Sequence, residues 1–232
     1  MAFDWTRFDS AQAAAEGLAE AVARDLRGVL AGKARARLAV SGGKSPIAFF
    51  QVLSRADLDW ARVDITLVDE RIVPTGHADS NTALVRAYLL QNRAAAAVWQ
   101  PLIDESADEC CLKNTAAAVE FALQHYARPD VAVLGMGTDG HTASLFPQSP
   151  QLTDGLSEAG VPLLHTTPVT APHERISMAL REILAVPHLY LAIGGAEKQA
   201  VFEQAAAAAD RALPVSLILH ARETQCHVFY AD

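Results

Sequence analysis

The sequence lacks the features that mark secreted and membrane proteins. It has three cysteines among 232 residues and no CxxC pair, because Cys110 and Cys111 are adjacent and Cys226 stands apart. An odd count without a disulfide framework is typical of a reduced, intracellular protein. No apolar run approaches the roughly 20 residues of a membrane span, and the N-terminal MAFDWTRFDS is unlike a signal peptide. We therefore expect a cytoplasmic protein with no membrane partner.

Positive charge is also scarce. The chain carries 19 Lys and Arg residues against 27 Asp and Glu residues, which gives a formal net charge of −8 at pH 7. A general nucleic-acid binder usually needs a basic face, so we expect no nucleic-acid partner. If the substrate is an anion, the few positive groups must be concentrated around its pocket.

Three common catalytic signatures are missing. The eight histidines include no HExxH, the cysteines lack metal-ligand spacing, and no GxSxG nucleophile elbow occurs. The sequence therefore predicts no metal site and no serine nucleophile. Any hydrolysis should proceed through an activated water molecule.

The composition and its patterning predict an α/β fold. Hydrophobic residues make up 51% of the chain and charged residues 20%, which suits a full core within one domain covering 1–232. A strand, a glycine turn and a helix recur at 37–53, 130–145 and 189–210. This alternation predicts a Rossmann-like, mainly parallel sheet with helices on both faces. The Pro- and Thr-rich stretch 161–173 reads as irregular and could mark a small second lobe.

Periodicity and turn residues predict the remaining elements. Helices are expected at 10–31 with Ser10 as the N-cap, from Ser80 or Asn81 to 90, at about 105–126 and at 196–210. Further strands are expected at 63–68, 98–103, 215–219 and 227–230. Ser45 fits the N-cap, and Pro46 the first position, of the helix that follows the first strand.

Glycine-rich or charged segments follow three of the predicted strands: SGGKS at 41–45, DER at 69–71 and GMGTDGH at 135–141. Ligands of open parallel sheets bind beyond the carboxyl ends of the strands, so these segments should converge on one site. SGGKS could cradle a phosphate with backbone N–H groups at the start of a helix. A tight turn explains it equally well, and it is not a P-loop, because Leu38 stands where that motif requires glycine.

The glycine-rich segment matches the GxGxxG dinucleotide fingerprint at Gly135, Gly137 and Gly140. That fingerprint needs an acidic residue about 20 positions further on, at the end of a second strand. Residues 150–160 are instead polar and turn-like, which argues against a nicotinamide or flavin cofactor.

His141 follows the glycine turn directly, at the predicted edge of the sheet. With a side chain that titrates near neutrality, a histidine there can take a proton from water. Asp139 could orient the imidazole or stabilise its charged form, as a carboxylate does in hydrolase triads. It could also simply support the turn.

Other charged residues have both a pocket and a surface interpretation. Asp69, Glu70 and Arg71 close a strand that begins in an apolar run, and their position favours the pocket over a solvated charge run. Arg175 and Lys198 could each grip a phosphate, the arginine through a bidentate fork and the lysine as a point charge.

Four segments together carry a resemblance to a known family. SGGKSP, VDITLVDERIVP with Asp79-Ser80-Asn81, GMGTDGHTASLFP and GGAEKQAVF, in this order and spacing, resemble the bacterial-type 6-phosphogluconolactonases over nearly the whole chain. The resemblance implies a fold like glucosamine-6-phosphate deaminase and ribose-5-phosphate isomerase. It also implies hydrolysis of the small molecule 6-phospho-D-glucono-1,5-lactone to 6-phosphogluconate, the second step of the oxidative pentose phosphate pathway, without a cofactor.

The resemblance also assigns residues. It places the general base on His141, the SGG loop on Ser41, Gly42 and Gly43, phosphate contacts on Arg175 and Lys198, and further site positions on Asp69, Arg71 and Asn81. Lys44 departs from the pattern, because many relatives carry a smaller residue there. It either adds a positive charge to the phosphate site or points outward.

Two other functions remain to be weighed. A glucosamine-6-phosphate deaminase or related isomerase shares the DGH motif, but it typically continues into an acidic NEP-type sequence where this chain has SLFP, and it has DEY where this chain has DER. A non-catalytic sugar-phosphate sensor would need an attached helix-turn-helix, for which there is no room before Arg37. The lactonase interpretation therefore leads.

Overall fold

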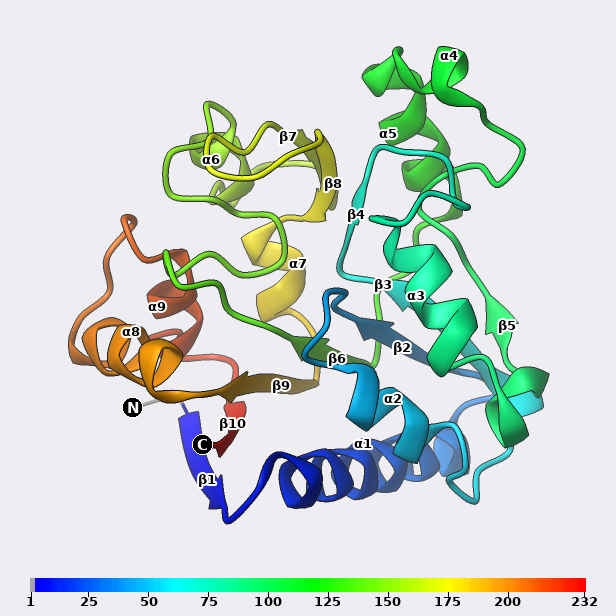
Figure 1. Cartoon of the computed structure of the whole chain (residues 1–232), viewed down its shortest axis with the longest axis vertical. Coiled ribbons are helices and arrows are strands. Elements are labelled where there is room, and N and C mark those ends of the chain that lie inside the picture. The colour runs from blue at the N-terminus through cyan, green and yellow to red at the C-terminus, as the bar shows by residue number, and fades with distance from the viewer. Residues whose placement is uncertain (1–2) are drawn as a thin grey trace.

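A seven-stranded parallel sheet forms the centre of the protein (Figure 1). The computed structural model describes residues 3–232. The strand order is β1-β10-β9-β6-β2-β3-β5, and every neighbouring pair is parallel. The strands are β1 (Phe3–Phe8), β2 (Ala36–Val40), β3 (Val63–Leu67), β5 (Val98–Trp99), β6 (Val131–Leu134), β9 (His188–Gly194) and β10 (Cys226–Ala231). All four residues of the central β6 are buried, as expected for a parallel strand covered on both faces.

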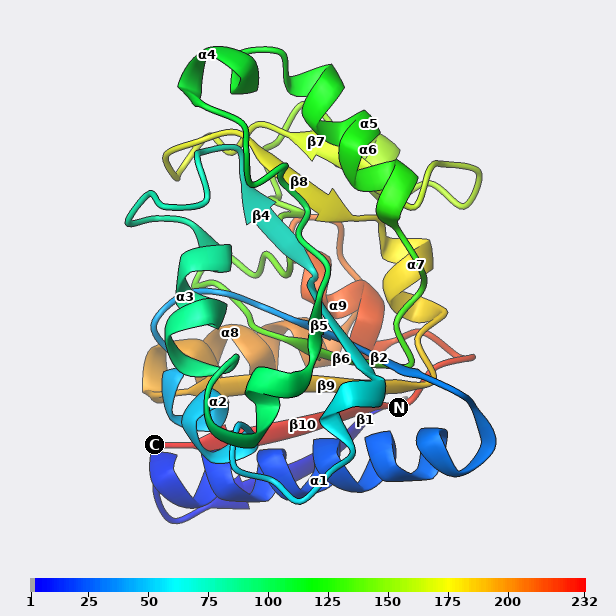
Figure 2. The ribbon, with the colours of Figure 1, turned by 90° about the vertical axis from the view of Figure 1, so that its right-hand side faces the viewer.

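Helices cover both faces of this sheet, as predicted. Figure 2 shows α1 along one face and α8 and α9 on the other. The helices are α1 (Ala11–Gly32), α2 (Ile47–Leu53), α3 (Asn81–Tyr88), α4 (Glu109–Leu112), α5 (Thr115–His125), α6 (Leu152–Gly155), α7 (Leu180–Leu184), α8 (Ala196–Ala207) and α9 (Pro214–Leu219), with 3-10 turns at Trp60–Arg62 and Asn92–Ala96. None of these described helices is both long enough and apolar enough to cross a membrane.

The first helix shows why the sequence folds this way. The Ser10 side chain accepts a hydrogen bond from the backbone N–H of Ala13, which confirms the predicted N-cap. Leu18, Val22 and Leu26 recur every four residues and are at most 3% exposed. Each buried side chain of this kind contributes about 1.5–3 kcal/mol, so packing on the sheet fixes the helix.

A second, three-stranded antiparallel sheet has the order β4-β8-β7 and consists of β4 (Asp69–Arg71), β7 (Leu163–Thr166) and β8 (Arg175–Met178). It lies on the opposite side of the main sheet from α1 (Figure 2). The sequence prediction was incomplete here, because the DER segment is a strand and the stretch 161–173 contains β7. The register pairs Arg71 with Arg175, so this small sheet brings together two cations that are far apart in the sequence.

Two predicted elements were wrong. The helix expected at about 105–126 is two helices, because Asp108 and Asn114 each accept a backbone hydrogen bond and start a new helix, α4 and α5. The strand expected at 215–219 is helix α9, with Pro214 in its first turn. Most of this apolar run is buried, and periodicity alone cannot separate a short buried strand from a short buried helix.

Several boundaries also differ from the prediction. Pro46 is the N-cap of α2 rather than its first residue, so Ser45 does not cap that helix. The strand expected at 98–103 is limited to the two residues of β5. No helix follows β6 directly, because residues 135–150 form turns as far as α6. The chain at 3–8 is a strand that the sequence analysis did not predict.

Candidate active site

A cavity of about 670 Å³ opens at the carboxyl ends of the central strands. The loops after β2, β6 and β9 meet around it, together with β4 and β8. Ten of the eleven site residues that the sequence suggested line this cavity: Ser41, Gly42, Gly43, Lys44, Asp69, Arg71, Asn81, His141, Arg175 and Lys198. Asp139 lies behind the lining, in contact with His141.

The loop after β6 holds His141 against Asp139. The imidazole Nδ1 is 2.5 Å from Asp139 Oδ1, and the same oxygen accepts the backbone N–H of His141 at 3.1 Å. The turn depends on glycine twice. Gly140 adopts a left-handed φ of +77°, and a Cβ at position 137 would lie 2.2 Å from the imidazole. The two side chains, although two residues apart, are therefore in direct contact.

This pair has the electrostatics of a base held by a carboxylate. Partial burial acts to raise the pKa of Asp139, but the hydrogen bond and charge of His141 outweigh it and lower that pKa below its usual value. Asp139 is therefore ionised near neutral pH. In the neutral imidazole, an Nδ1–H that donates to this carboxylate leaves Nε2 as the proton acceptor. The ring of Phe146 stacks on His141 with centroids 4.1 Å apart and fixes its plane.

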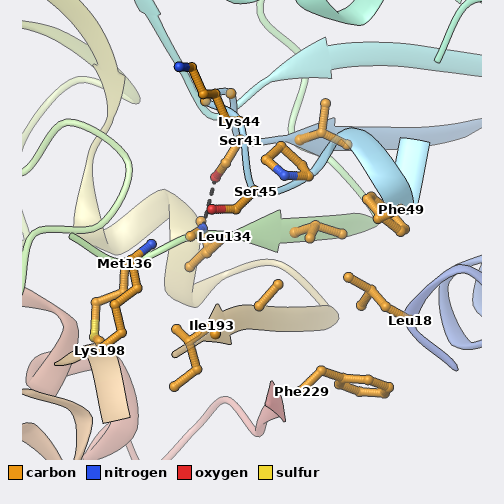
Figure 3. A pocket seen from close by; sticks show the side chains of 18 of the residues that line it. Leu18, Ser41, Lys44, Ser45, Phe49, Leu134, Met136, Ile193, Lys198 and Phe229 are labelled. Carbon is orange, nitrogen blue, oxygen red and sulfur yellow. Dashed lines mark hydrogen bonds between the residues drawn. The ribbon is translucent and has the colours of Figure 1, made fainter. Parts of the chain in front are cut away.

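The SGG loop joins this turn through Ser41. Its hydroxyl accepts a hydrogen bond from the backbone N–H of Gly135 at 3.0 Å, the dashed line in Figure 3. Gly42 packs so tightly that a Cβ there would lie 1.8 Å from Asn81 Oδ1, and Gly43 has a φ of +88°. Lys44 is exposed, and its side chain is directed away from the apolar end of the cavity (Figure 3).

Two arginines come from the small antiparallel sheet. Arg175 is 6% exposed, its Nη1 lies 3.9 Å from Asp69 Oδ2, and its guanidinium lies 5.4 Å from the centre of the Phe146 ring. Burial lowers the pKa of Arg175, although the charge of Asp69 opposes that effect. Within residues 3–232, the buried Nε atoms of Arg71 and Arg175 have no hydrogen-bond partner. Unpaired buried donors are costly, so both arginines are suited to an anionic ligand.

Lys198 adds a further cation from the first turn of α8. Its side chain lines the same cavity as Met136 and Ser41, and its ammonium is directed toward the carboxyl end of β6 (Figure 3). Burial lowers the pKa of Lys198 below that of a free lysine. Lys44, Arg71, Arg175 and Lys198 together line a cavity to which the acidic residues Asp69 and Asp232 contribute. Local positive charge is thus concentrated in a protein of net charge −8.

Glu70 was expected to enter the pocket with Asp69 and Arg71, but it is fully buried behind the cavity and does not line it. Its carboxylate accepts the backbone N–H groups of Arg71, Asn81 and Thr82 and the hydroxyls of Ser80 and Thr82. Burial raises the pKa of Glu70, against the effect of these hydrogen bonds. Glu70 therefore ties the start of α3 to β4, and only the short spacing between DER and the Ser80 cap hints at this in the sequence.

Ser144 is a second residue, besides Glu70, whose structural role the sequence did not predict, although it lies in the segment GMGTDGHTASLFP. Its buried hydroxyl donates to Asp69 Oδ2 at 2.6 Å, while the backbone N–H of Ser144 donates to Ser177 on β8. Ser144 therefore anchors the histidine loop to β4 and β8, whereas Thr142 donates to the Gly135 carbonyl within the loop itself.

The fold and site define an α/β protein with a cation-lined pocket and a histidine–carboxylate pair at the edge of a parallel sheet. The family model for glucosamine-6-phosphate isomerases/6-phosphogluconolactonase matches residues 9–228, so the chain belongs to that family. The 6-phosphogluconolactonase of Neisseria meningitidis serogroup A is 56% identical over 231 residues, which cover 99% of this chain and 100% of the relative.

Solved structures agree with this relationship. A crystal structure from Neisseria gonorrhoeae is 57% identical and superimposes with a TM-score of 0.97, covering 99% of this chain and 100% of that one. A 6-phosphogluconolactonase from Shewanella baltica is 38% identical with a TM-score of 0.88, covering 98% and 97% of the two chains. These likenesses confirm the predicted fold class and family.

Proposed function

We propose that this protein hydrolyses 6-phospho-D-glucono-1,5-lactone to 6-phospho-D-gluconate in the oxidative pentose phosphate pathway. The observation that carries the proposal is the His141–Asp139 pair at a cation-lined cavity, in a chain 56% identical over its length to a 6-phosphogluconolactonase. The alternative is a glucosamine-6-phosphate deaminase. It is disfavoured because similar proteins from Neisseria meningitidis and Helicobacter pylori are named 6-phosphogluconolactonase, and because Phe146-Pro147 stand where a deaminase has a carboxylate.

The phosphate binds at the positive part of the cavity. Arg175 and Lys198 supply the charge, and the backbone of Gly42 and Gly43 supplies N–H donors, because the N–H of Ser41 already donates to the Val133 carbonyl. Arg175 has a buried unpaired Nε, and ligand binding would give that donor a partner. Binding energy at this remote group orients the lactone carbonyl for attack.

The reaction then needs one base and one oxyanion donor. His141 Nε2 takes a proton from water while the water oxygen bonds to the lactone carbonyl carbon, and Asp139 stabilises the imidazolium. Arg71 or a backbone N–H stabilises the oxyanion, which is worth roughly 3–4 kcal/mol for a well-placed donor. The bond to the ring oxygen breaks as the tetrahedral intermediate collapses, and the imidazolium returns the proton to that oxygen.

The remaining site residues take supporting roles in this proposal. Asp69 accepts from Ser144 and faces Arg175, and Asn81 donates to the Asp69 carbonyl, so both order the wall of the cavity. We also propose that residues 1–232 act as one sugar-phosphate-binding domain in the cytoplasm. Its substrate is a small molecule, without nucleic acid, consistent with one family model covering 9–228.

The direct test is a coupled assay with freshly generated 6-phosphogluconolactone, corrected for its spontaneous hydrolysis. The His141→Ala variant should lower kcat by on the order of 10²–10⁴, while His125→Gln, a substitution of an exposed histidine outside the cavity, should not. Near-normal turnover in His141→Ala would refute the base assignment. Ammonia release from glucosamine 6-phosphate would favour the alternative function.

The phosphate role of Arg175 has its own test. Arg175→Gln should raise KM for the phosphorylated lactone far more than for plain gluconolactone, which lacks the phosphate. The exposed Arg55 outside the cavity provides the matched control, Arg55→Gln, which should leave both values unchanged. Equal effects of Arg175→Gln on the two substrates would remove the phosphate contact from the proposal.

A further inference from the structure

Three metal-ligating side chains meet outside the cavity: His77, Asp79 and His173. One ligand atom from each lies within 4.8 Å of the other two. His173 Nε2 is 2.9 Å from Asp79 Oδ2, and His77 Nδ1 is 3.9 Å from the same oxygen. None of the three residues lines the active-site cavity. Their positions, two apart and then 94 apart in the chain, explain why no ligand spacing appears in the sequence.

The two loops that carry these residues are held together independently of the cluster. They leave β4 and β8 at the paired residues Arg71 and Arg175, and the backbone N–H of Ile72 donates to the Glu174 carbonyl at 2.8 Å. His173 itself adopts a left-handed φ of +67°, which is unusual for a residue with a side chain. The backbone therefore already presents His173 to the opposite loop.

The donor atoms have the right chemistry for a metal ion. The backbone N–H of Asp79 donates to His77 Nδ1 at 3.1 Å, so this nitrogen is unprotonated and carries a lone pair. A cation would exchange that hydrogen bond for a coordination bond. The side chains of His77, Asp79 and His173 are 38%, 53% and 27% exposed, which leaves room for an ion and its water ligands.

The required adjustment is small. Zinc binds imidazole nitrogen and carboxylate oxygen at about 2.0–2.2 Å, so its ligand atoms lie roughly 3–3.5 Å from one another. The separations of 2.9 and 3.9 Å to the Asp79 oxygen bracket that range, and the third, between ligand atoms of the two histidines, lies within 4.8 Å, so the imidazoles must move closer together to share an ion. Two imidazoles and one carboxylate suit Zn²⁺ or Co²⁺ better than Mg²⁺ or Ca²⁺, which prefer oxygen ligands alone.

We propose that His77, Asp79 and His173 form a binding site for a divalent transition-metal ion such as Zn²⁺. The bound ion would cross-link the loop between β4 and α3 to the loop before β8. The Asp79 carbonyl accepts a hydrogen bond from Arg71, so the ion would also fix the backbone that holds this cavity-lining arginine. The site takes no part in the hydrolysis proposed above, and its test is independent of that function.

Calorimetric titration of the chelator-treated full chain with ZnCl₂ tests the proposal. Cys110 and Cys111 are exposed thiols and could bind zinc themselves, so the titration uses the Cys110→Ser/Cys111→Ser background. We expect one Zn²⁺ per chain, and at least about tenfold weaker binding when His77→Gln or His173→Gln is added. Co²⁺ titrated into the same background should give a d–d absorption spectrum that each of these variants abolishes.

The matched control is His227→Gln. His227 pairs with Asp4 at 3.0 Å and is partly exposed, so it reproduces the histidine–carboxylate contact at a site that forms no such three-residue cluster among residues 3–232. This variant should keep full zinc affinity. No zinc binding in the Cys110→Ser/Cys111→Ser background, or unchanged affinity in both His77→Gln and His173→Gln, would overturn the proposal.

Discussion

Adding one methyl group at Gly137 should disable catalysis while leaving the protein folded. An alanine Cβ at this position would lie 2.2 Å from Cε1 and Nδ1 of His141 and 2.7 Å from Asp139 Oδ1, whereas ordinary contact begins at 3.4 Å. The imidazole must therefore shift by about 1.2 Å, and a misplacement of about 1 Å can cost 10²-fold in rate. That loss corresponds to about 2.7 kcal/mol of transition-state stabilisation.

The backbone itself tolerates the substitution. Gly43, Gly140 and Gly195 are the described glycines with a positive φ, and Gly137 is not among them. Gly137→Ala should therefore keep its fold, with a Tm close to that of the wild type. Gly28→Ala is the matched control, because a Cβ at this helical position meets nothing within 4 Å and should change neither kcat nor folding.

The measurement is kcat on fresh 6-phosphogluconolactone, with circular dichroism to show that each variant is folded. If the methyl group acts through the imidazole, Gly137→Ala should have little further effect in a His141→Ala background. A folded Gly137→Ala variant with near-normal kcat would refute the geometry of the histidine loop. A full additional loss in the double variant would show that position 137 acts by another route.

Three further predictions concern the residues around the pair. Asp139→Asn removes the charge opposite the imidazolium. Because the contact is partly exposed and solvent weakens it, we expect a moderate loss, with kcat about 10- to 100-fold lower. An unchanged kcat would leave Asp139 with no role beyond the turn. Glu70→Gln places an amide N–H₂ opposite donors such as the Thr82 N–H, with which it cannot form a hydrogen bond. The free energy of unfolding, measured by urea denaturation, should therefore fall by about 1–3 kcal/mol. An equally stable variant would show that the hydrogen bonds of Glu70 are dispensable. Burial lowers the pKa of Lys198, so its charge is lost at a lower pH than that of a free lysine, and the affinity for 6-phosphogluconate measured by calorimetry should fall from neutral toward alkaline pH. The phosphate is already dianionic in this range, so it does not cause the change. Lys198→Gln should abolish this alkaline loss of affinity, and a loss that persists in the variant would exclude Lys198 as its cause.

Much of the main sheet was predictable because its signals are local. Strands such as β2 and β6 are short, largely buried apolar runs that lead into glycine-containing turns, and Ser10 caps α1 where the pattern begins. The helix α9 was mistaken for a strand because a short, mostly buried apolar run has no informative period. The strand β1 was missed because its four central residues are exposed and show no alternation.

The residues of the site also differ in whether local sequence could predict them. His141 could be found from the sequence because a glycine turn and an aspartate mark it locally. Glu70 could not, because its five hydrogen bonds depend on β4 folding back against the start of α3. The meeting of His77 with His173 depends on two loops that approach only through the register of the small sheet.

The order of the main sheet has a consequence for synthesis. β10 lies between β1 and β9, so among residues 3–232 the first strand in the chain, β1, has β10, the last one, as its single partner. While the ribosome is still translating residues 226–231, β1 has no place in the sheet, and β9 presents an open edge. The sheet can therefore close only after translation has passed residue 231, and the nascent chain must be kept from pairing with other chains until then.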